Sequence, residues 1–476
     1  MTGTSALSPS ERLSLLVDDG SLELWPVQDG VSVLAASGRI ERRPVLAYAQ
    51  DGAIAGGSLG EAEAAVVVDV LRRSRDLGVP VISFIESAGA RLQEGANALG
   101  AYGRIFYENV ALSRKVPQIS IITGTSAGGG CYSPALTDFV VMIKSANMFL
   151  TGPRVVNEAL NENVAAEALG GPRVHARNGV CDFVAVDETD AAALARLLLR
   201  YLPQRAGEHP PTVRRVQSPP GRPDRYVPAS PRRVYDVRGV VRSIVDGGDL
   251  LEVSPLWASN LVTGFAHLAG RATGIVANQP KVLGGVLDSA ASLKGAGFVG
   301  LCSDYGIPLV VLVDTPGFLP GTKQEADGVI SHGATLVRAF ASASVPRVTV
   351  ILRKAYGGAY IAMNAKSLGA DMAFAWPQAE IGIIGARAAA KIVHRRELAV
   401  ARDAAGTLDR LASLYARHHL SPLAAARIGL IDSVIEPRRT REVVATALRQ
   451  ASPQHGDFQQ QSRVRGFAEP VIRRAA

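Results

Sequence analysis

Short runs of apolar, strand-like residues alternate along this chain with longer helical stretches. The strand-like runs include residues 81–85 in the first half and 309–313 in the second. The helical stretches expected from the pattern are residues 62–77, 100–115, 333–343, 387–416 and 440–451. Alternation at this spacing predicts an α/β fold assembled from strand–helix units.

The most informative pattern is a repeat between the two halves. Leu77-Gly78-Val79-Pro80 opens the run 81–85, which ends in Glu86-Ser87-Ala88-Gly89. Tyr305-Gly306-Ile307-Pro308 opens the run 309–313, which ends in Asp314-Thr315-Pro316-Gly317. Residue 306 follows residue 78 by 228 positions.

A second pair of blocks keeps nearly the same spacing. Val116-Pro117 leads through an apolar run to Ala127-Gly128-Gly129-Gly130, and Val345-Pro346 leads through another to Tyr356-Gly357-Gly358-Ala359. Residue 346 follows residue 117 by 229 positions. Two blocks in one register predict two copies of a single α/β domain.

A proline-rich segment separates the copies. Eight of the 27 prolines lie between Pro203 and Pro231. Proline fixes φ and removes a hydrogen-bond donor, so the segment resists helix and central strand. We therefore expect a linker at 203–235, between an N-terminal domain at 1–202 and a C-terminal domain at 236–476.

The glycine blocks are the candidate chemical sites. Each follows a strand-like run and precedes a helical stretch, where the first N–H groups of a helix have no internal partner. Gly128, Gly129 and Gly130 in one half, and Gly357–Ala359 in the other, are therefore expected to aim backbone donors at an oxyanion. A tight turn that needs glycine only for packing remains the alternative.

One rival motif overlaps the first block. Gly124-Thr125-Ser126-Ala127-Gly128 matches the nucleophile elbow of α/β-hydrolases. Ser126 aligns with Ala355 in the second copy while the glycines are retained, which argues against a shared hydroxyl nucleophile. His394 or His418 stays open as a triad partner.

The strand ends also carry equivalent carboxylates, Glu86 and Asp314. The second belongs to a D-x-x-G sequence like that of GTPases, but the chain has no G-x-x-x-x-G-K-[ST] phosphate loop. These carboxylates could act as general bases, cap the next helix, or pair with Arg91 or Lys323.

Composition narrows the function classes. The net charge of +8 fits a phosphate-bearing substrate or an acidic partner, and no basic run interleaved with aromatic residues indicates nucleic acid. The three cysteines, Cys131, Cys181 and Cys302, are too far apart for a zinc site or disulfide framework, and no metal is expected. Residues 1–14 lack an apolar signal core and no run could span a membrane, so we expect a cytoplasmic protein without membrane contact.

Several longer motifs together resemble one known family. They are Ala88-Gly89-Ala90-Arg91-Leu92-Gln93-Glu94-Gly95, Tyr132-Ser133-Pro134-Ala135-Leu136-Thr137-Asp138, Thr151-Gly152-Pro153, Asp314-Thr315-Pro316-Gly317-Phe318-Leu319-Pro320-Gly321, Arg353-Lys354-Ala355-Tyr356-Gly357-Gly358-Ala359-Tyr360 and Ala375-Trp376-Pro377. In this order they resemble the carboxyltransferase (β) subunits of biotin-dependent acetyl- and propionyl-CoA carboxylases, over about residues 10–450.

The resemblance implies an α/β fold of two tandem crotonase-like (ClpP/crotonase ββα spiral) domains. It implies a homohexamer in which each active site lies between the N-domain of one subunit and the C-domain of another. The implied activity moves a carboxyl group from carboxybiotin to a short acyl-CoA. The chain lacks an A-M-K-M biotinylation sequence, so biotin is expected on a partner biotin carboxylase/biotin carboxyl carrier subunit.

The resemblance also assigns roles to residues. Gly128–Gly129 would hold the thioester oxygen of the acyl-CoA enolate, and Gly358–Ala359 the ureido oxygen of biotin. Ile361, beside the acyl pocket, favours acetyl-CoA and hence malonyl-CoA as product, with propionyl-CoA possible. The further implied contacts are Ala88, Gly89, Ala90, Arg91, Tyr132 and Tyr360 for acyl-CoA, and Pro316, Gly317 and Tyr356 on the biotin side.

Two other functions stay open. The same oxyanion sites would serve a biotin-independent decarboxylase of a malonyl-type or β-keto acid, and a non-catalytic scaffold of a carboxylase complex is the third possibility. Ala88 stands where the family usually has glycine, and Arg154 replaces a common acidic residue. These departures bear on chain-length preference more than on the class of reaction.

Overall fold

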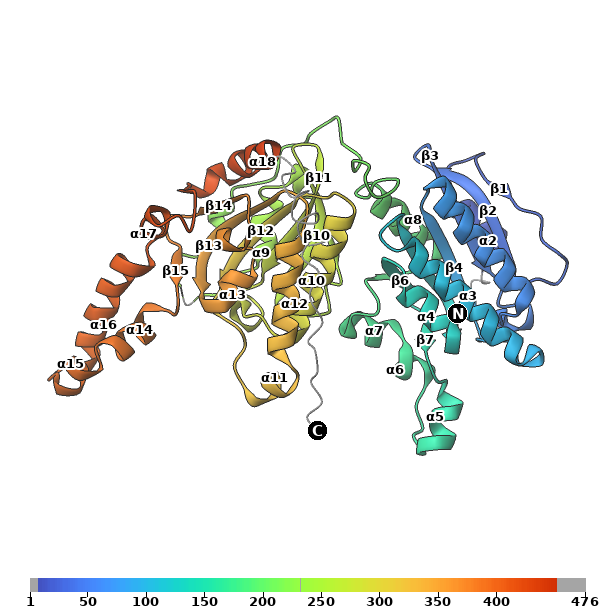
Figure 1. Cartoon of the computed structure of the whole chain (residues 1–476), viewed down its shortest axis with the longest axis horizontal. Helices are drawn as coiled ribbons and strands as arrows, with labels where there is room; N and C mark the ends of the chain where they lie inside the picture. The colour runs from blue at the N-terminus through green and yellow to red at the C-terminus, as the bar shows by residue number, and fades with distance from the viewer. Residues whose placement is uncertain (1–6, 232, 452–476) are drawn as a thin grey trace, which may run out of the picture.

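The computed structural model describes residues 7–231 and 233–451, and within them each half of the chain forms one sheet (Figure 1). The first is eight-stranded with the order β1-β2-β3-β4-β5-β6-β8, and β7 pairs with β5. Its strands are β1 (Glu23–Leu24), β2 (Val33–Ile40), β3 (Arg43–Gln50), β4 (Val81–Ser87), β5 (Gln118–Ala127), β6 (Phe139–Ile143), β7 (Asn147–Phe149) and β8 (Phe183–Ala185).

The second sheet repeats this plan. It is eight-stranded with the order β16-β14-β13-β12-β11-β10-β9, and β15 pairs with β13. Its strands are β9 (Leu251–Val253), β10 (Leu261–Leu268), β11 (Arg271–Asn278), β12 (Leu309–Thr315), β13 (Arg347–Tyr356), β14 (Met372–Ala375), β15 (Glu380–Gly382) and β16 (Ser433–Val434).

Pairing confirms the duplication strand by strand. In each half an antiparallel hairpin, β2–β3 or β10–β11, is followed by parallel strands. Backbone angles repeat as well: Gly78 and Gly306 have φ of 66° and 67°, and Gly128 and Gly357 both have 58°. Glycine adopts this left-handed region without the steric cost that other residues incur, which explains why glycine stands at these positions in both copies.

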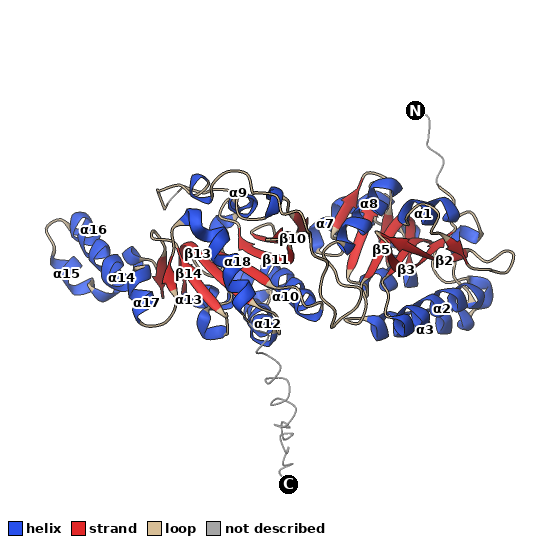
Figure 2. Cartoon of the chain, turned by 90° about the horizontal axis from the view of Figure 1, so that it is seen from above, coloured by secondary structure: helices blue, strands red, loops and turns tan. Residues whose placement is uncertain are grey.

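Helices cover both faces of each sheet. Those of the first half are α1 (Pro9–Leu16), α2 (Glu61–Leu77), α3 (Ala96–Leu112), α4 (Tyr132–Ala135), α5 (Pro153–Leu160), α6 (Ala166–Gly170), α7 (Pro172–Asn178) and α8 (Glu188–Leu199). Figure 2 shows α2 and α3 on one side of the first sheet, with α1 and α8 on the other. Leu13 and Leu16 of α1 are fully buried, and each contributes roughly 1.5–3 kcal/mol to stability.

The second half has the same layers and an added arm. Its helices are α9 (Val237–Arg242), α10 (Ser289–Asp304), α11 (Thr322–Ala326), α12 (Val329–Ser342), α13 (Gly357–Ala362), α14 (Ala386–Val393), α15 (Arg395–Val400), α16 (Ala404–Tyr415), α17 (Pro422–Arg427) and α18 (Thr440–Gln450). Helices α9 and α18 share an apolar core with the sheet. Helices α14–α16 project from the end of the molecule that lies away from the first half (Figure 1), and they pack around a small hydrophobic cluster of their own.

Two helix predictions need correction. The stretch expected at 100–115 is α3, which ends at Leu112, because Arg114 turns the chain with φ of 62° towards β5. The stretch expected at 387–416 is not one helix but α14, α15 and α16, and a π-helical turn then covers Ala416–Leu420. The other three expected helices are observed as α2, α12 and α18.

The two halves also meet within the chain. Tyr305 of the second half donates its hydroxyl to Asp138 Oδ2 at 2.7 Å and to the Val116 carbonyl at 2.9 Å. Ser254 donates to Asp182 Oδ1 at 2.7 Å. Burial raises the pKa of both Asp138 and Asp182 to about 6. These bonds join the two halves of the chain.

The segment between the sheets is mostly irregular, with one short 3-10 turn at Pro223–Arg225. We keep 203–235 as the proposed linker between domains 1–202 and 236–476. Residues 1–6, part of the stretch that lacks a signal core, lie outside the described residues, as does the end of the second domain after residue 451. Among the described helices, none combines the length and apolarity needed to cross a bilayer.

Candidate active site

The first donor turn lies at the end of β5. A 3-10 turn, Gly128–Cys131, follows Ala127 and runs into α4. Gly128 and Gly129 open this turn, where the first N–H groups of a helix have no partner within the helix. A methyl group at Gly129 would lie 3.0 Å from the ring of Tyr102. The turn therefore needs glycine for space as well as for φ.

Neighbouring side chains fix this turn from behind. Ser126 donates its hydroxyl to the Gly130 carbonyl at 2.9 Å, and the Cys131 thiol contacts the carbonyls of Ser126 and Phe149 at 3.0 Å each. Burial raises the pKa of Cys131 to about 11. The hydroxyl of Ser126 is fully buried and occupied, so it has the place of a structural residue and not of a hydrolase nucleophile.

The second donor turn lies at the end of β13. Gly357 opens the six-residue helix α13, so Gly357 and Gly358 lie in its first turn, where N–H groups have no partner within the helix. A methyl group at Gly357 would lie 3.1 Å from the Ile383 carbonyl oxygen, whereas at Gly358 the nearest atom, on Phe318, is 3.9 Å away. Gly358 is thus open to an approaching ligand, while Ala359 is buried.

Both following helices are short. The sequence pattern predicted a helical stretch after each glycine block, but α4 has four residues and α13 has six. A helix dipole grows from many aligned peptide units, so the turns themselves, and not long helices, orient these donors.

A loop from β4 packs on the first turn. Gly89 has φ of 100°, and a methyl group there would lie 3.1 Å from the Ala127 carbonyl oxygen. The Ala88 N–H donates to Gly56 and the Arg91 N–H to Leu59, which fixes the loop around Ala90. In the second half Gly317, with φ of 145°, follows Pro316 in the equivalent loop.

The side chains expected at the site differ in availability. Tyr132, directly after the first turn, is 51% exposed and could contact a ligand. Arg91 instead binds Glu63 at 2.5 Å and the Ser58 carbonyl at 2.8 Å. Its contact with substrate stays a prediction.

The hydroxyl groups of two tyrosines near the second turn are already hydrogen-bonded within the protein. Tyr360 donates to the Leu430 carbonyl at 3.3 Å, and burial raises its pKa to about 12. Tyr356 donates to Glu380, and burial raises its pKa as well. Both therefore stay protonated at neutral pH and act as neutral groups beside the turn. Ile361, one residue further, is 45% exposed.

The carboxylates at the strand ends, Glu86 and Asp314, do not pair with the expected partners Arg91 and Lys323. Glu86 pairs with Arg12 at 2.8 Å, and Asp314 pairs with Arg353 at 3.0 Å. Arg91 pairs with Glu63 and Glu94, and Lys323 with Asp327. The suggested pairs Glu86–Arg91 and Asp314–Lys323 are wrong, because in each case an arginine from outside the loop lies closer. No motif singled out Arg12; its only sequence signal is a charge beside the apolar Leu13.

Several cavities lie away from the donor turns. Three of about 710, 480 and 410 Å³ are lined respectively by residues around α1, around Tyr201 and His267, and along the contact between the halves. Neither Gly128 nor Gly357 lines these three cavities. Among the described residues, no group of three or more His, Cys, Asp or Glu side chains is placed to hold a metal ion.

Comparison with known proteins gives the family. The model of the carboxyl transferase domain matches residues 17–465. The methylmalonyl-CoA carboxyltransferase 12S subunit of Propionibacterium freudenreichii subsp. shermanii is 46% identical, over 90% of this chain and 83% of that one. The propionyl-CoA carboxylase beta chain of Roseobacter denitrificans is 43% identical, over 94% and 90%. The methylmalonyl-CoA decarboxylase subunit alpha of Veillonella parvula is also 43% identical, over 88% and 82%.

A solved structure agrees with the sequence relatives. The transcarboxylase 12S crystal structure, described as a hexamer assembly with methylmalonyl-CoA bound, aligns with a TM-score of 0.89 and 41% identity, over 98% of this chain and 91% of that one. Fold and site thus define a protein of two tandem crotonase-like α/β domains. The chain belongs to the carboxyl transferase family, as a β-type subunit of the biotin-dependent acyl-CoA carboxyltransferases.

Proposed function

We propose that this chain transfers a carboxyl group from carboxybiotin, carried on a partner subunit, to the α-carbon of a short acyl-CoA. The observation that carries the proposal is the repeated donor turn. Gly128 and Gly357 occupy equivalent strand ends with the same φ of 58°, and each opens a helical turn whose first N–H groups have no partner within the helix. Negative charge develops on an oxygen of each reactant, and fixed N–H dipoles stabilise such charge.

The two turns would have separate tasks. Gly128 and Gly129 would hold the thioester oxygen while the α-carbon loses its proton and the enolate forms. Gly358 and Ala359 would hold the ureido oxygen of biotin, for which the open surface at Gly358 is suited. Bound carboxybiotin supplies the carboxyl group and the base. The protein side therefore needs no side-chain base, in agreement with the ion-paired state of Glu86 and Asp314.

A complete site would need two chains. In Figure 1 helix α4, next to the first turn, and α13, at the second, are separated by α10 and α12. We therefore propose that the first turn of one subunit faces the second turn of another, in a homohexamer such as the one described for the transcarboxylase 12S core. A biotin carboxylase/biotin carboxyl carrier chain would be the further partner.

The acyl group is a short one. The relatives' names point to propionyl-CoA or methylmalonyl-CoA, and the preference for acetyl-CoA expected from Ile361 is not confirmed. We propose propionyl-CoA as the main substrate and acetyl-CoA as the second.

Decarboxylation is the second candidate function. The relative named methylmalonyl-CoA decarboxylase subunit alpha, at 43% identity, favours it. The same enolate would form when a malonyl-type thioester loses CO2, and the first donor turn would stabilise it in the same way.

Reconstitution separates these candidates. The chain is combined with a biotinylated carrier, its carboxylase, ATP, bicarbonate and a panel of acyl-CoAs. Carrier-dependent formation of methylmalonyl-CoA or malonyl-CoA is the expected result. Release of CO2 from a malonyl-type thioester without any carrier would support the second candidate and count against the first.

A further inference from the structure

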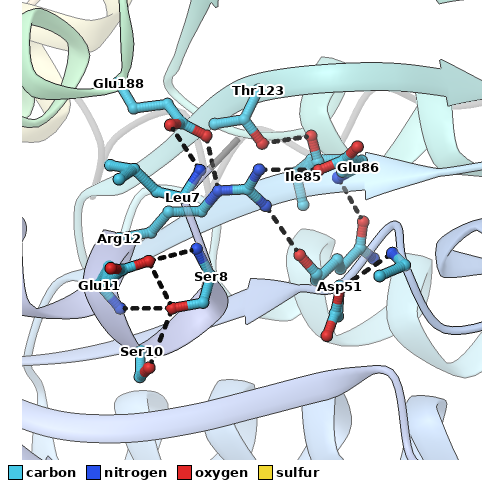
Figure 3. Close-up of polar contacts among 12 residues, drawn as sticks. Leu7, Ser8, Ser10, Glu11, Arg12, Asp51, Ile85, Glu86, Thr123 and Glu188 are labelled. Atoms are coloured by element: carbon cyan, nitrogen blue, oxygen red, sulfur yellow. Dashed lines mark hydrogen bonds and ion pairs between the residues drawn. The ribbon is translucent and has the colours of Figure 1, made fainter. Parts of the chain in front are cut away.

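A buried arginine connects helix α1 to the end of strand β4. Arg12 is 2% exposed, and its Nε donates to Glu188 Oε1 at 2.7 Å. Its Nη2 donates to Glu86 Oε2 at 2.8 Å, and its Nη1 to the Gln50 carbonyl at 3.0 Å. Figure 3 shows Arg12 reaching Glu188 on one side and the end of β4, at Ile85 and Glu86, on the other. The planar fork of arginine presents fixed donors to three acceptors that lie in different directions.

Glu86 stands where the β4–β5 ladder is irregular. Ile85 pairs with Ile122, but Ser87, only two residues on, pairs with Ser126, four residues on. The extra residues of β5 bulge opposite Glu86, and such bulges redirect the strand that follows. The strand redirected here is the one that ends in the first donor turn.

The Glu86 carboxylate is packed against this bulge. A methyl group at Gly124, inside the bulge, would lie 2.7 Å from the Glu86 side chain, and one at Gly52 would lie 2.4 Å from it. Gly124 precedes Gly128 by four positions. The position of the carboxylate, which Arg12 sets, therefore restrains the backbone directly before the donor turn.

The second half meets the same requirement with another arrangement. Asp314 stands at the equivalent bulge between Val313 and Thr315, and accepts from Arg353 at 3.0 Å and from the Lys354 N–H at 3.1 Å. Arg353 follows Gly124 by 229 positions, so the arginine stands inside the bulge itself. In the first half Gly124, which has no side chain, stands at the position equivalent to Arg353. The cation that pairs with Glu86 is therefore Arg12 of α1.

We infer that Arg12 is a positioning residue for the acyl-CoA side, which acts through Glu86 and the β5 bulge on Gly128 and Gly129. The inference rests on the proposed function of the first donor turn. Helix α1 lies outside the sheet and is remote from the glycines in sequence. Through Arg12 it nevertheless helps to orient the N–H groups of Gly128 and Gly129.

Two variants test this, each of which keeps all charges. In Arg12→Lys, the single ammonium group cannot reach Glu188, Glu86 and the Gln50 carbonyl together. In Glu86→Asp, the side chain is shorter by one methylene group, which withdraws the carboxylate from Arg12. Misplacement of a catalytic group by about 1 Å costs on the order of 100-fold. We expect kcat for acyl-CoA carboxylation to fall about 10- to 100-fold in both variants, with an unchanged KM for the carboxylated carrier.

The readout specific to the donor turn is inhibitor binding. An acyl-CoA thioester has the oxygen that the turn would hold, and the matching alkyl-CoA thioether lacks it. The variants should lose most of the thioester's advantage in Ki while the Ki of the thioether stays within about twofold, because the remainder of the CoA contacts is intact.

Arg196→Lys is the matched control. Arg196 of α8 also holds α1, through the Leu16 carbonyl at 2.8 Å and Asp18 at 2.8 Å, but it does not contact Glu86. We expect wild-type kcat and inhibitor ratios. An equal loss in this control would reduce Arg12 to a tether of α1 and overturn the inference.

The outcomes separate the inference from the proposed function. If the wild-type protein shows no preference for thioester over thioether, the donor role of Gly128 and Gly129 fails. If the wild type shows that preference and both Arg12→Lys and Glu86→Asp retain it with full kcat, the donor role stands and the role of Arg12 fails. Should Arg12→Lys not fold, Glu86→Asp decides alone.

Discussion

Substitution of Gly128 by alanine is the most direct test of the first donor turn. Gly128 has φ of 58°, and an added methyl group would meet no atom within 4 Å. Overlap with residues other than the two chain neighbours is therefore excluded as a cause of any loss. What remains is the cost of a left-handed alanine, about 1–2 kcal/mol, and the effect on the N–H group.

The peptide at an alanine in this position can respond in two ways. If the peptide rotates, the donor turns away from the thioester oxygen. If it stays, the new methyl group stands in the open space that the substrate would enter. Loss of one oxyanion donor lowers kcat by about 100- to 1,000-fold, and a 100-fold loss corresponds to about 2.7 kcal/mol of transition-state stabilisation.

Gly30→Ala is the matched control. Gly30 lies in an exposed turn with φ of 81° and likewise has no atom within 4 Å of an added methyl group. Thermal unfolding should detect a similar stability loss in both variants, and steady-state carboxylation of propionyl-CoA should detect a large loss only in Gly128→Ala. If the two variants have kcat values within about twofold of each other, Gly128 donates nothing to the reaction and the argument is refuted.

Three further perturbations follow from the same contacts. Ile361→Asp removes a branched apolar side chain beside the second turn, and the ratio of kcat/KM for propionyl-CoA over acetyl-CoA should rise by roughly tenfold; an unchanged ratio would exclude this residue from specificity. Burial raises the pKa of Asp138 to about 6, so folding favours its protonated form; that stability is complete below about pH 4 and lost as pH rises through 6. The contribution of Asp138 to the unfolding free energy should therefore fall by about 1 kcal/mol between pH 5 and 7, and Asp138→Asn should remove that part of the pH dependence in paired denaturant titrations. Tyr305→Phe removes the hydroxyl bonds to Asp138 and Val116 and should cost about 1–3 kcal/mol of stability while kcat stays at the wild-type value, which parallel unfolding and activity assays would check.

Much of the fold could be predicted because its signals are local. The blocks around Gly78 and Gly306 recur in register, and glycine at a left-handed φ is a requirement of the backbone at that residue alone. The α/β class, the duplication and the glycine turns all depend on such short-range patterns. Helix boundaries could not be predicted in this way: α3 ends at Leu112 because of the turn at Arg114, which no periodic pattern reveals.

Pairings over long distance could not be predicted. Glu86 offered Arg91 as a nearby partner, yet its partner is Arg12, 74 positions away in the sequence. The amino-acid sequence alone determined that two copies of one domain each place a glycine turn at a strand end, because strand, turn and φ preference are properties of neighbouring residues. Only the tertiary structure decided which arginine neutralises which carboxylate behind those donors, because that depends on the helices and strands that folding brings together.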